Sequence, residues 1–416
     1  MSTSHYTLVG PFKQLLTMED IPLKGALADH TLPVIEDGGI MLHRDRIYKV
    51  GSYVDLLEEA EAKQAEIHVL DSDYVGMPGF IDAHTHICFA GSRSNDYAMR
   101  NAGKSYLEIA KQGGGIWNTV THTRKATQDE LEEGIIRRAE RHLSEGVTTI
   151  EVKSGYGLTV DCELKMLRSI ANTNKNHVID LIPTCLAAHI KPKDFDGDEK
   201  EYLDHIIQEL LPIVQQEKLS RRVDIFIEET AFSVELATSF LEQAKALGFN
   251  VTVHADQFST GGSEVAIHVD AMSADHLEAS TDKEIELLSK SNVIPIALPG
   301  ASMGLGCPFT PARKLLDSGC SLVIASDWNP GSAPMGDLLM QASILGTYEK
   351  LSNAEILSAL TFRAAAALGL NDRGVLSNDK LGDIIAFPCS HFNEVLYQQG
   401  KLKPSMIWKR GVQVCQ

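Results

Sequence analysis

The sequence predicts an α/β fold whose larger part is a (β/α)₈ TIM barrel, together with a small β-sandwich domain built from both chain termini. From about residue 80 onward, eight short β-rich runs alternate with longer helical patterns, as in parallel βα units. Residues 80–370 also supply the length of about 250 residues or more that such a barrel needs. An open, doubly wound sheet fits the alternation as well, but polar residues at the strand ends favour the barrel.

The expected barrel strands are runs rich in β-branched and apolar residues. They cover residues 79–86, 147–157, 178–189, 222–232, 249–258, 270–280, 292–300 and 321–328. Helices between and after them begin with the capping-box pattern Ser/Thr-x-x-Glu. This pattern occurs at Thr127 with Glu130, Thr281 with Glu284, and Ser352 with Glu355. One buried helix face is predicted at spacing four, by Leu131, Ile135, Ala139 and Leu143.

The segments that flank the barrel contain short strand-like runs. In residues 39–51 the charged run HRDR lies between two apolar runs, which predicts a hairpin turn. Residues 375–416 contain two more such runs, LGDIIAFP and SMIWKRGVQV. We therefore expect residues 1–79 and 373–416 to form one composite small β domain, with the catalytic barrel at 80–372 inserted between them.

Composition and charge restrict the class of protein. The net charge of −18 argues against binding to nucleic acid or to an anionic membrane surface. The N-terminus lacks the pattern of a signal peptide and no apolar stretch is long enough for a bilayer, so we expect a cytoplasmic protein. The cysteines are dispersed without a CxxC pair and are expected to be reduced, small buried residues: Cys88, Cys162, Cys185, Cys307, Cys320, Cys389 and Cys415.

Side chains that bind metals or move protons occur at the carboxyl ends of the predicted strands, which converge on one mouth of a barrel. In chain order they are His84, His86, Tyr156, His189, His254, His276 and Asp327. His84 and His86 are two residues apart on a strand, so both can reach one ion. His254 and Asp327 would complete a nitrogen and oxygen shell with room for water. One HxH pair alone is more often two ordinary histidines, but the matching strand ends favour a metal site.

A metal in this shell would lower the pKa of its bound water from ~15.7 to about 7 and polarise a substrate carbonyl. The fourth strand ends in Glu228 and Glu229, with no lysine there to become a carbamylated bridge, so we predict one metal ion. Asp327 is a candidate proton acceptor as well as a ligand. His276 is a candidate for stabilising the oxyanion or passing a proton to the leaving nitrogen, and its alternative is a hydrogen-bonded core histidine. Which of the two is the principal base stays open.

These residues resemble the amidohydrolase superfamily and, within it, the imidazolonepropionases. The segments that carry the resemblance span the barrel: HTHICFAGSR (84–93), SYLEIAKQGGGI (105–116), VKSGYGL (152–158), LAAHIKP (186–192), VHADQ (253–257), ADHLE (274–278) and SDWNPGSAP (326–334). The resemblance implies hydrolysis of 4-imidazolone-5-propanoate to N-formimidoyl-L-glutamate in histidine degradation. It also implies zinc or iron bound by His84, His86, His254 and Asp327, with His276 catalytic.

The resemblance further implies a set of substrate-binding residues, namely Arg93, Tyr156, His189, Gln257, Asn329, Gly331 and Ser332. The arginine fork of Arg93 suits a carboxylate tail, although an arginine of this kind can also form a surface ion pair. The run N-P-G-S (329–332) offers backbone N–H and hydroxyl donors for a second anionic group, and its alternative is an ordinary Pro-Gly turn. Gly113, Gly114 and Gly115 allow a close approach to ligand or form a flexible loop. Gln257 is an amide and cannot act as a base.

Two other functions fit parts of the pattern. A deaminase of a heterocyclic ring would use the same water but release ammonia, and the carboxylate-binding features argue against it. A scaffold without activity would be expected to lose metal ligands, and every ligand that we identify is present. We expect a small-molecule substrate with a carboxylate tail and a homodimer, and no nucleic-acid or membrane partner.

Overall fold

The computed structural model describes residues 6–104, 108 and 112–415. Within these residues the chain forms two compact units. The first comprises Met1–Asp82, Arg141–Thr149 and Asp337–Gln416, and the second comprises Ala83–Glu140 and Ile150–Gly336. The predicted domain boundaries, 1–79 with 373–416 and 80–372, are not decided by this division and remain a prediction.

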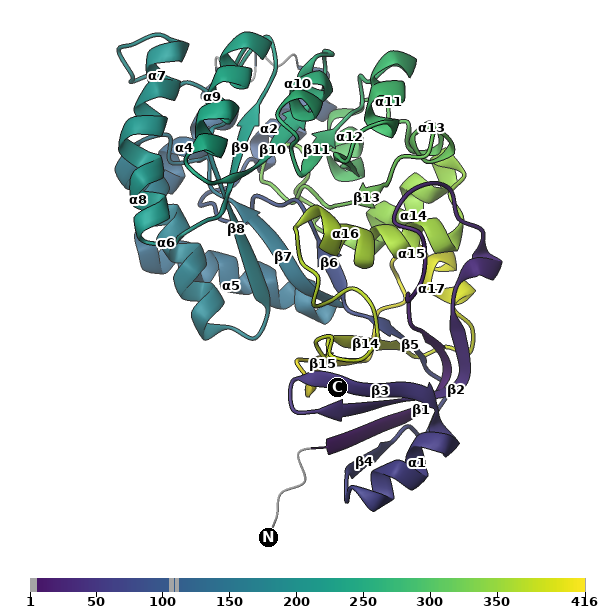
Figure 1. Cartoon of the computed structure of the whole chain (residues 1–416). Coiled ribbons are helices and arrows are strands. Elements are labelled where there is room, and N and C mark those ends of the chain that lie inside the picture. Colours follow the sequence, from purple (N-terminus) through teal and green to yellow (C-terminus); the bar gives the residue numbers. More distant parts are fainter. Residues whose placement is uncertain (1–5, 105–107, 109–111, 416) are drawn as a thin grey trace. The chain divides into compact units, whose positions relative to one another are not determined.

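The barrel is confirmed, with its strands in simple chain order β6 to β13 (Figure 1). Their bounds are β6 Phe80–Asp82, β7 Val147–Lys153, β8 Asp180–Ala188, β9 Arg222–Phe226, β10 Asn250–Ala255, β11 Ser273–His276, β12 Ile294–Ala297 and β13 Val323–Ile324. Each lies inside a run that the sequence predicted. Just beyond the first and last strands, Thr85 pairs with Trp328 in a parallel bridge, and the Asp327 N–H donates to the His84 carbonyl at 3.0 Å. These bonds join the two ends of the sheet next to the predicted ligands.

Helices follow most barrel strands and pack on their outer side. α6 contacts β8, α9 contacts β9 and β10, and α10 contacts β10 and β11 (Figure 1). The helices of residues 83–336 are α2 Ser94–Asn101, α4 Ile116–Lys125, α5 Gln128–Ser144, α6 Val160–Asn176, α7 Glu199–His205, the π-helix η2 Ile206–Leu210, α8 Leu211–Gln216, α9 Val234–Ala246, α10 Gly262–His268, α11 Asp282–Ser289, α12 Pro299–Leu305 and α13 Ala312–Asp317. Later helices are α14 Leu338–Glu349, α15 Asn353–Ala359, α16 Phe362–Ala367 and α17 Asn393–Tyr397.

The local helix signals are confirmed. Reciprocal capping bonds form at Thr281 with Glu284 and at Ser352 with Glu355. Thr127 and Glu130 exchange the same two bonds, at 2.8 and 3.2 Å, before α5. The predicted face of α5 is buried along its whole length, as shown by Leu131, Ile135, Ala139 and Leu143. Each cap satisfies backbone N–H groups that the helix itself leaves unpaired.

The small sheet combines both terminal segments, as predicted. Its order is β16-β15-β14-β5-β1-β2-β3, with β4 paired to β1. The bounds are β1 Tyr6–Leu16, β2 Val34–His43, β3 Arg46–Ser52, β4 Glu66–Val69, β5 Val75–Pro78, β14 Ile384–Phe387, β15 Met406–Lys409 and β16 Val412–Cys415, with helices η1 Asp29–Thr31 and α1 Tyr53–Ala62. The antiparallel pair β5–β14 joins the N-terminal strands to the C-terminal ones. β2 and β3 form the predicted hairpin, whose turn places Arg44 at φ 59°.

Two further sequence predictions concern membranes and cysteines. Among the described residues, no helix combines the length and the apolar character that crossing a bilayer requires. The six cysteines whose side chains are described take part in no disulfide, and Cys88, Cys185, Cys320 and Cys389 are buried as predicted. The prediction is wrong for Cys162 and Cys307, which are half-buried because one lies in the first turn of α6 and the other in the loop after α12. The side chain of Cys415 lies outside the described residues.

Candidate metal centre and active site

Three histidines and one aspartate converge at the carboxyl ends of the barrel strands. His84 Nε2 lies 3.3 Å from His86 Nε2, and His86 Nε2 lies 3.4 Å from His254 Nε2. Asp327 Oδ1 lies 3.6 Å from His84 Nε2 and 3.3 Å from His86 Nε2. All four side chains are buried. His86 thus lies next to His84, His254 and Asp327, so the four predicted ligands form one connected cluster.

Two carboxylates contact the Nδ1 atoms of His84 and His254, on the side of each ring opposite to Nε2. Asp275 Oδ2 lies 2.6 Å from His84 Nδ1, and Asp224 Oδ2 lies 2.9 Å from His254 Nδ1. A carboxylate at Nδ1 favours the tautomer with the proton there, which leaves the Nε2 lone pair free to bind a metal. The ring orientation and the donor atoms thus fit a bound cation.

The electrostatics agree with this fit. Burial lowers the pKa of His86 to about 3, and burial together with the neighbouring Lys153 ammonium lowers the pKa of His84 well below its usual value. Burial also lowers the pKa of His254 and raises that of Asp327. The three imidazoles are therefore neutral, as metal ligands must be. Nitrogen lone pairs at 3.3–3.4 Å from one another repel unless a cation or a proton lies between them.

His276 lies on the other side of the same cluster. One of its ring nitrogens lies within 4.8 Å of nitrogens of His84 and His254. Its Nδ1 lies 3.3 Å from Glu278 Oε1. Burial opposes a charge on His276, but Glu278, Asp327 and Asp275 outweigh burial and raise its pKa. His276 is thus better able to carry a proton than the three neutral imidazoles beside it.

The backbone at two of these residues is held in an unfavourable conformation. His276 has φ 89° and Asp327 has φ 50°, values that L-residues other than glycine rarely adopt. Strain of this kind costs about 1–3 kcal/mol per residue and persists where the surrounding structure requires it, often at functional sites. Both residues lie at the carboxyl end of a barrel strand: His276 is the last residue of β11, and Asp327 follows β13.

Tyr156 and His189 lie against His86. The centroid of the His86 ring is 5.9 Å from that of Tyr156 and 5.6 Å from that of His189. His189 Nδ1 lies 3.0 Å from the Gly155 carbonyl, and a Cβ on Gly155 (φ 103°) would come within 2.8 Å of the Leu186 carbonyl. Glycine is therefore required there. Burial raises the pKa of the Tyr156 hydroxyl, which stays protonated as a donor.

Arg93 lines a cavity of about 380 Å³ near these residues, together with Tyr97, Arg138, Trp328 and Asn329 among others. Its Nε donates to Asp96 Oδ2 at 2.8 Å, and the same oxygen accepts from the Gly115 N–H at 2.8 Å. The Asp96 carboxylate thus holds both the Arg93 side chain and the backbone of Gly115 in place. Of the segment 105–116, residues 105–107 and 109–111 lie outside the described residues.

The loop after Asp327 differs from its sequence-based interpretation. The N–H groups of Gly331 and Ser332 both donate to Asn329 Oδ1, at 2.7 and 2.8 Å. They are therefore engaged within the loop and do not stand free for an anion, because the asparagine side chain completes its own turn. The Ser332 hydroxyl donates to Asp327 Oδ2 at 3.4 Å, while the other oxygen of this carboxylate, Oδ1, lies near His84 and His86. A Cβ on Gly331 would lie 2.2 Å from Arg93 Nη1, so glycine leaves space for the guanidinium.

Gln257 follows β10 and is half-buried. Sequence reasoning assigned no role to the groups that support the site, although several lie inside the segments that carried the resemblance. They are Asp96, Glu151, Lys153, Asp224, Asp275 and Glu278. For the four that lie in strands, the available signal was a charged residue inside a buried strand, whereas Asp96 in α2 and Glu278 after β11 carried no such signal. Lys153 is fully buried, and its pKa is raised because Asp224, Glu151 and Asp275 outweigh the effect of burial.

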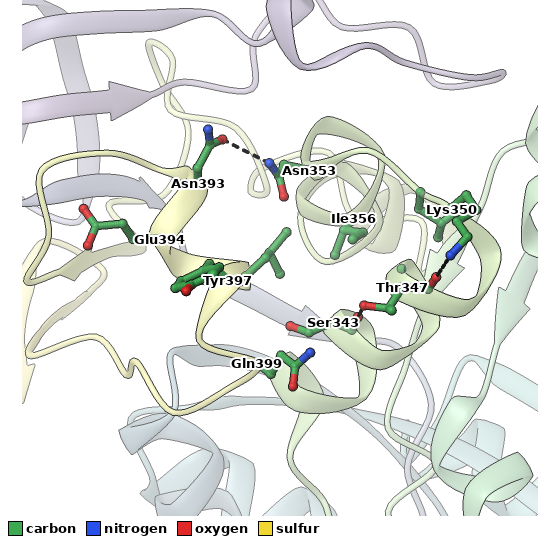
Figure 2. A pocket seen from close by; sticks show the side chains of 12 residues that line it. Ser343, Thr347, Lys350, Asn353, Ile356, Asn393, Glu394, Tyr397 and Gln399 are labelled. Atoms are coloured by element: carbon green, nitrogen blue, oxygen red, sulfur yellow. Dashed lines mark hydrogen bonds between the residues drawn. The ribbon is translucent and has the colours of Figure 1, made fainter.

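A second cavity, of about 740 Å³, lies between α14, α15 and α17 in the other unit (Figure 2). Hydroxyl, amide and apolar side chains line it, with Asn353 donating to Asn393 at 3.0 Å. None of the predicted site residues belongs to its lining.

Comparison with known proteins agrees with this chemistry. The sequence profile of the amidohydrolase family matches residues 75–414. The imidazolonepropionase of Bacillus cytotoxicus is 40% identical over 403 residues, which are 96% of this chain and 94% of that protein. The imidazolonepropionase of Bacillus mycoides is 39% identical over 410 residues, 97% of this chain and 96% of that protein.

Solved structures share the fold at low identity. Atrazine chlorohydrolase from Arthrobacter aurescens, complexed with zinc, superposes with a TM-score of 0.71 at 14% identity, over 99% of this chain and 95% of that chain. An adenosine deaminase from Xanthomonas campestris with bound zinc gives 0.70 at 18% identity, over 98% and 92%. The profile match and the near-full-length relatives together show that this chain belongs to the amidohydrolase family and groups with the imidazolonepropionases within it.

Proposed function

We propose that this protein hydrolyses the ring of 4-imidazolone-5-propanoate to N-formimidoyl-L-glutamate, a step of histidine degradation. The observation that carries the proposal is the meeting of three neutral imidazole nitrogens and one carboxylate oxygen at the barrel mouth. The imidazolonepropionases at 39–40% identity supply the substrate class.

His84, His86, His254 and Asp327 would hold one metal ion, zinc or iron. When bound, such an ion supplies a water that is deprotonated near neutral pH and polarises the carbonyl under attack. The donor set of three nitrogens and one oxygen is common for zinc and also occurs with iron.

The chain's own residues then handle protons. The water oxygen bonds to the ring carbonyl carbon, the C–N bond breaks, and the leaving nitrogen takes up a proton. Asp327 or His276 accepts the proton of the attacking water, because both side chains lie at the cluster of proposed ligands. His276, supported by Glu278, stabilises the oxyanion or delivers the proton to nitrogen. The order of these roles stays open.

Substrate binding is assigned to residues around this centre: Arg93, Tyr156, His189, Gln257, Asn329, Gly331 and Ser332. Arg93 is positioned by Asp96 and suits the propionate carboxylate, which it can bind through two parallel N–H donors. His189 uses one ring nitrogen for Gly155, so the other is available to the ring of the substrate. Ser332 would contact the substrate through its hydroxyl, which lies beside Asp327.

The test is to incubate the purified protein with imidazolone propionate and to follow the product by mass. Ring opening adds one whole water, whereas a deaminase would exchange an amino group for oxygen. His254→Ala is expected to lose both metal and turnover. Arg93→Ala should keep the metal and raise KM, because the carboxylate loses a charge-assisted partner. Full activity in both variants would contradict the assignment, and metal-free wild-type protein would favour a scaffold.

A homodimer in the cytoplasm, without nucleic-acid or membrane partners, completes the proposal. The acidic composition supports the absence of nucleic-acid and anionic-membrane partners. Light scattering on the eluting protein measures the mass of the assembly, and a monomeric mass would contradict the dimer.

A further inference from the structure

Lys153 is the last residue of β7 and lies with no solvent exposure among three carboxylates. Its Nζ is 2.9 Å from Glu151 Oε1, 2.9 Å from Asp224 Oδ2 and 3.8 Å from Asp275 Oδ2. Three carboxylates at such separations, away from water, repel one another strongly unless a cation lies between them. The lysine ammonium provides that cation.

Each of the three carboxylates also contacts the metal-binding segment. Asp275 Oδ2 lies 2.6 Å from His84 Nδ1, and Asp224 Oδ2 lies 2.9 Å from His254 Nδ1. Glu151 Oε2 accepts from the backbone N–H of Thr85, between His84 and His86, at 3.1 Å. The Thr85 hydroxyl donates to the Glu151 carbonyl at 2.6 Å. The Lys153 ammonium therefore contacts carboxylates that hold both His84 and His254, two proposed metal ligands that are far apart in the sequence.

We infer that Lys153 is a positioning residue for the metal centre: it holds Asp224 and Asp275 where they orient the His254 and His84 rings toward one ion. This inference rests on the proposed metal site. Without the ammonium, the carboxylates move apart and the two rings lose their common direction. Metal affinity then falls, although no ligand has been removed.

A matched control exists elsewhere in the chain. Lys409 is 3% exposed and lies 2.5 Å from Asp383 Oδ2 in the small sheet. Lys409→Met removes a buried lysine from an acidic partner, just as Lys153→Met does. Any general effect of burying an uncompensated carboxylate should therefore occur in both variants, whereas an effect on the metal centre should occur only at Lys153.

The experiment measures Zn²⁺ affinity of the metal-free full-length proteins by competition with a chelator, and records the absorption spectrum of the Co²⁺-substituted proteins. Lys153→Met should weaken Zn²⁺ binding by about 10–100-fold, the usual effect of losing a group that supports a ligand, and alter the Co²⁺ spectrum. Lys409→Met should lower the melting temperature and leave affinity and spectrum unchanged. Lys153→Arg, which keeps the charge, should recover part of the affinity.

A second change separates positioning from stability. Adding Glu151→Gln to Lys153→Met removes one of the three repelling charges but neither carboxylate that holds a histidine, so it should restore part of the Zn²⁺ affinity. If Lys153→Met does not fold, the Zn²⁺ affinity of this double variant tests the inference in its place. Wild-type Zn²⁺ affinity in Lys153→Met would overturn the inference. Where Lys153→Met does not fold, wild-type Zn²⁺ affinity in the double variant would overturn it. Failure of the wild type to bind Zn²⁺ would instead count against the proposed metal site.

Discussion

The small sheet and the barrel mouth both bury charged groups, but the side chains that surround these groups differ. In the sheet, Lys409 and Asp383 form a buried pair beside an apolar core that contains Phe12, Leu15 and Trp408. At the barrel mouth, histidines, carboxylates and Lys153 pack directly against one another. Burying apolar surface stabilises the fold by about 25 cal/mol per Å², whereas burying charge costs free energy that pairing only partly returns.

This difference in surroundings indicates which region contributes to stability and which contributes to function. The sheet core has the composition expected of a region that holds a fold together. The barrel mouth carries a desolvation cost together with positive φ at His276 and Asp327, and neither of these helps the fold. Changes at the mouth should therefore alter activity more than stability, and changes in the sheet core should do the reverse.

The largest effect on this comparison is expected from His276→Ala. Turnover should fall by about 10²–10⁴-fold, because a group that donates or accepts a proton in the reaction is removed. Zinc content should be preserved, since the four proposed ligands remain. Steady-state kinetics and metal analysis measure both. His268→Ala is the control, because His268 also pairs with a glutamate but is exposed. Unchanged turnover in His276→Ala would make this residue an ordinary buried histidine.

A smaller and opposite effect is expected in the sheet. Phe12 is fully buried and packs edge-on against Trp408, with ring centroids 6.3 Å apart. Phe12→Ala should destabilise the fold by about 3–5 kcal/mol, through lost burial and a new cavity. Thermal melting would show this loss, while kcat of the protein that remains folded should not change. Tyr397→Ala, at an 84% exposed aromatic, is the control and should melt like the wild type.

The smallest effect is expected at a helix cap. The Thr281 hydroxyl accepts from the Lys283 N–H, and the Thr281 backbone N–H donates to the Glu284 carboxylate, before α11. Thr281→Ala should cost about 1 kcal/mol of stability. Thr238→Ala, inside α9, removes a hydroxyl that donates to the Val234 carbonyl of the same helix and should be nearly neutral. Equal melting temperatures for the two variants would mean that the cap contributes nothing.

Much of the fold could be predicted from the sequence, because its signals are local. Alternating runs mark the strands, Thr281 with Glu284 marks a helix start, and HRDR marks a turn. The metal cluster was also predictable, since parallel strand ends must converge and His84 and His86 share a face.

What the sequence did not predict depends on contacts between distant strands. The run 147–157 predicts a strand at Lys153 but not that Asp224 and Asp275 meet this lysine, because that requires the register of three strands. The loop 329–332 illustrates the same limit at short range. The sequence left two interpretations of its N–H groups, free donors or an ordinary turn, and the bonds to Asn329 favour the turn.

The most direct test of the account is removal and return of the metal. The purified protein should contain about one metal ion per chain, in line with a single shell of four ligands. Dialysis against a chelator should abolish hydrolysis of imidazolone propionate, and Zn²⁺ or Fe²⁺ should restore it in the wild type but not in His254→Ala. Full turnover in protein shown to be free of metal would contradict the account.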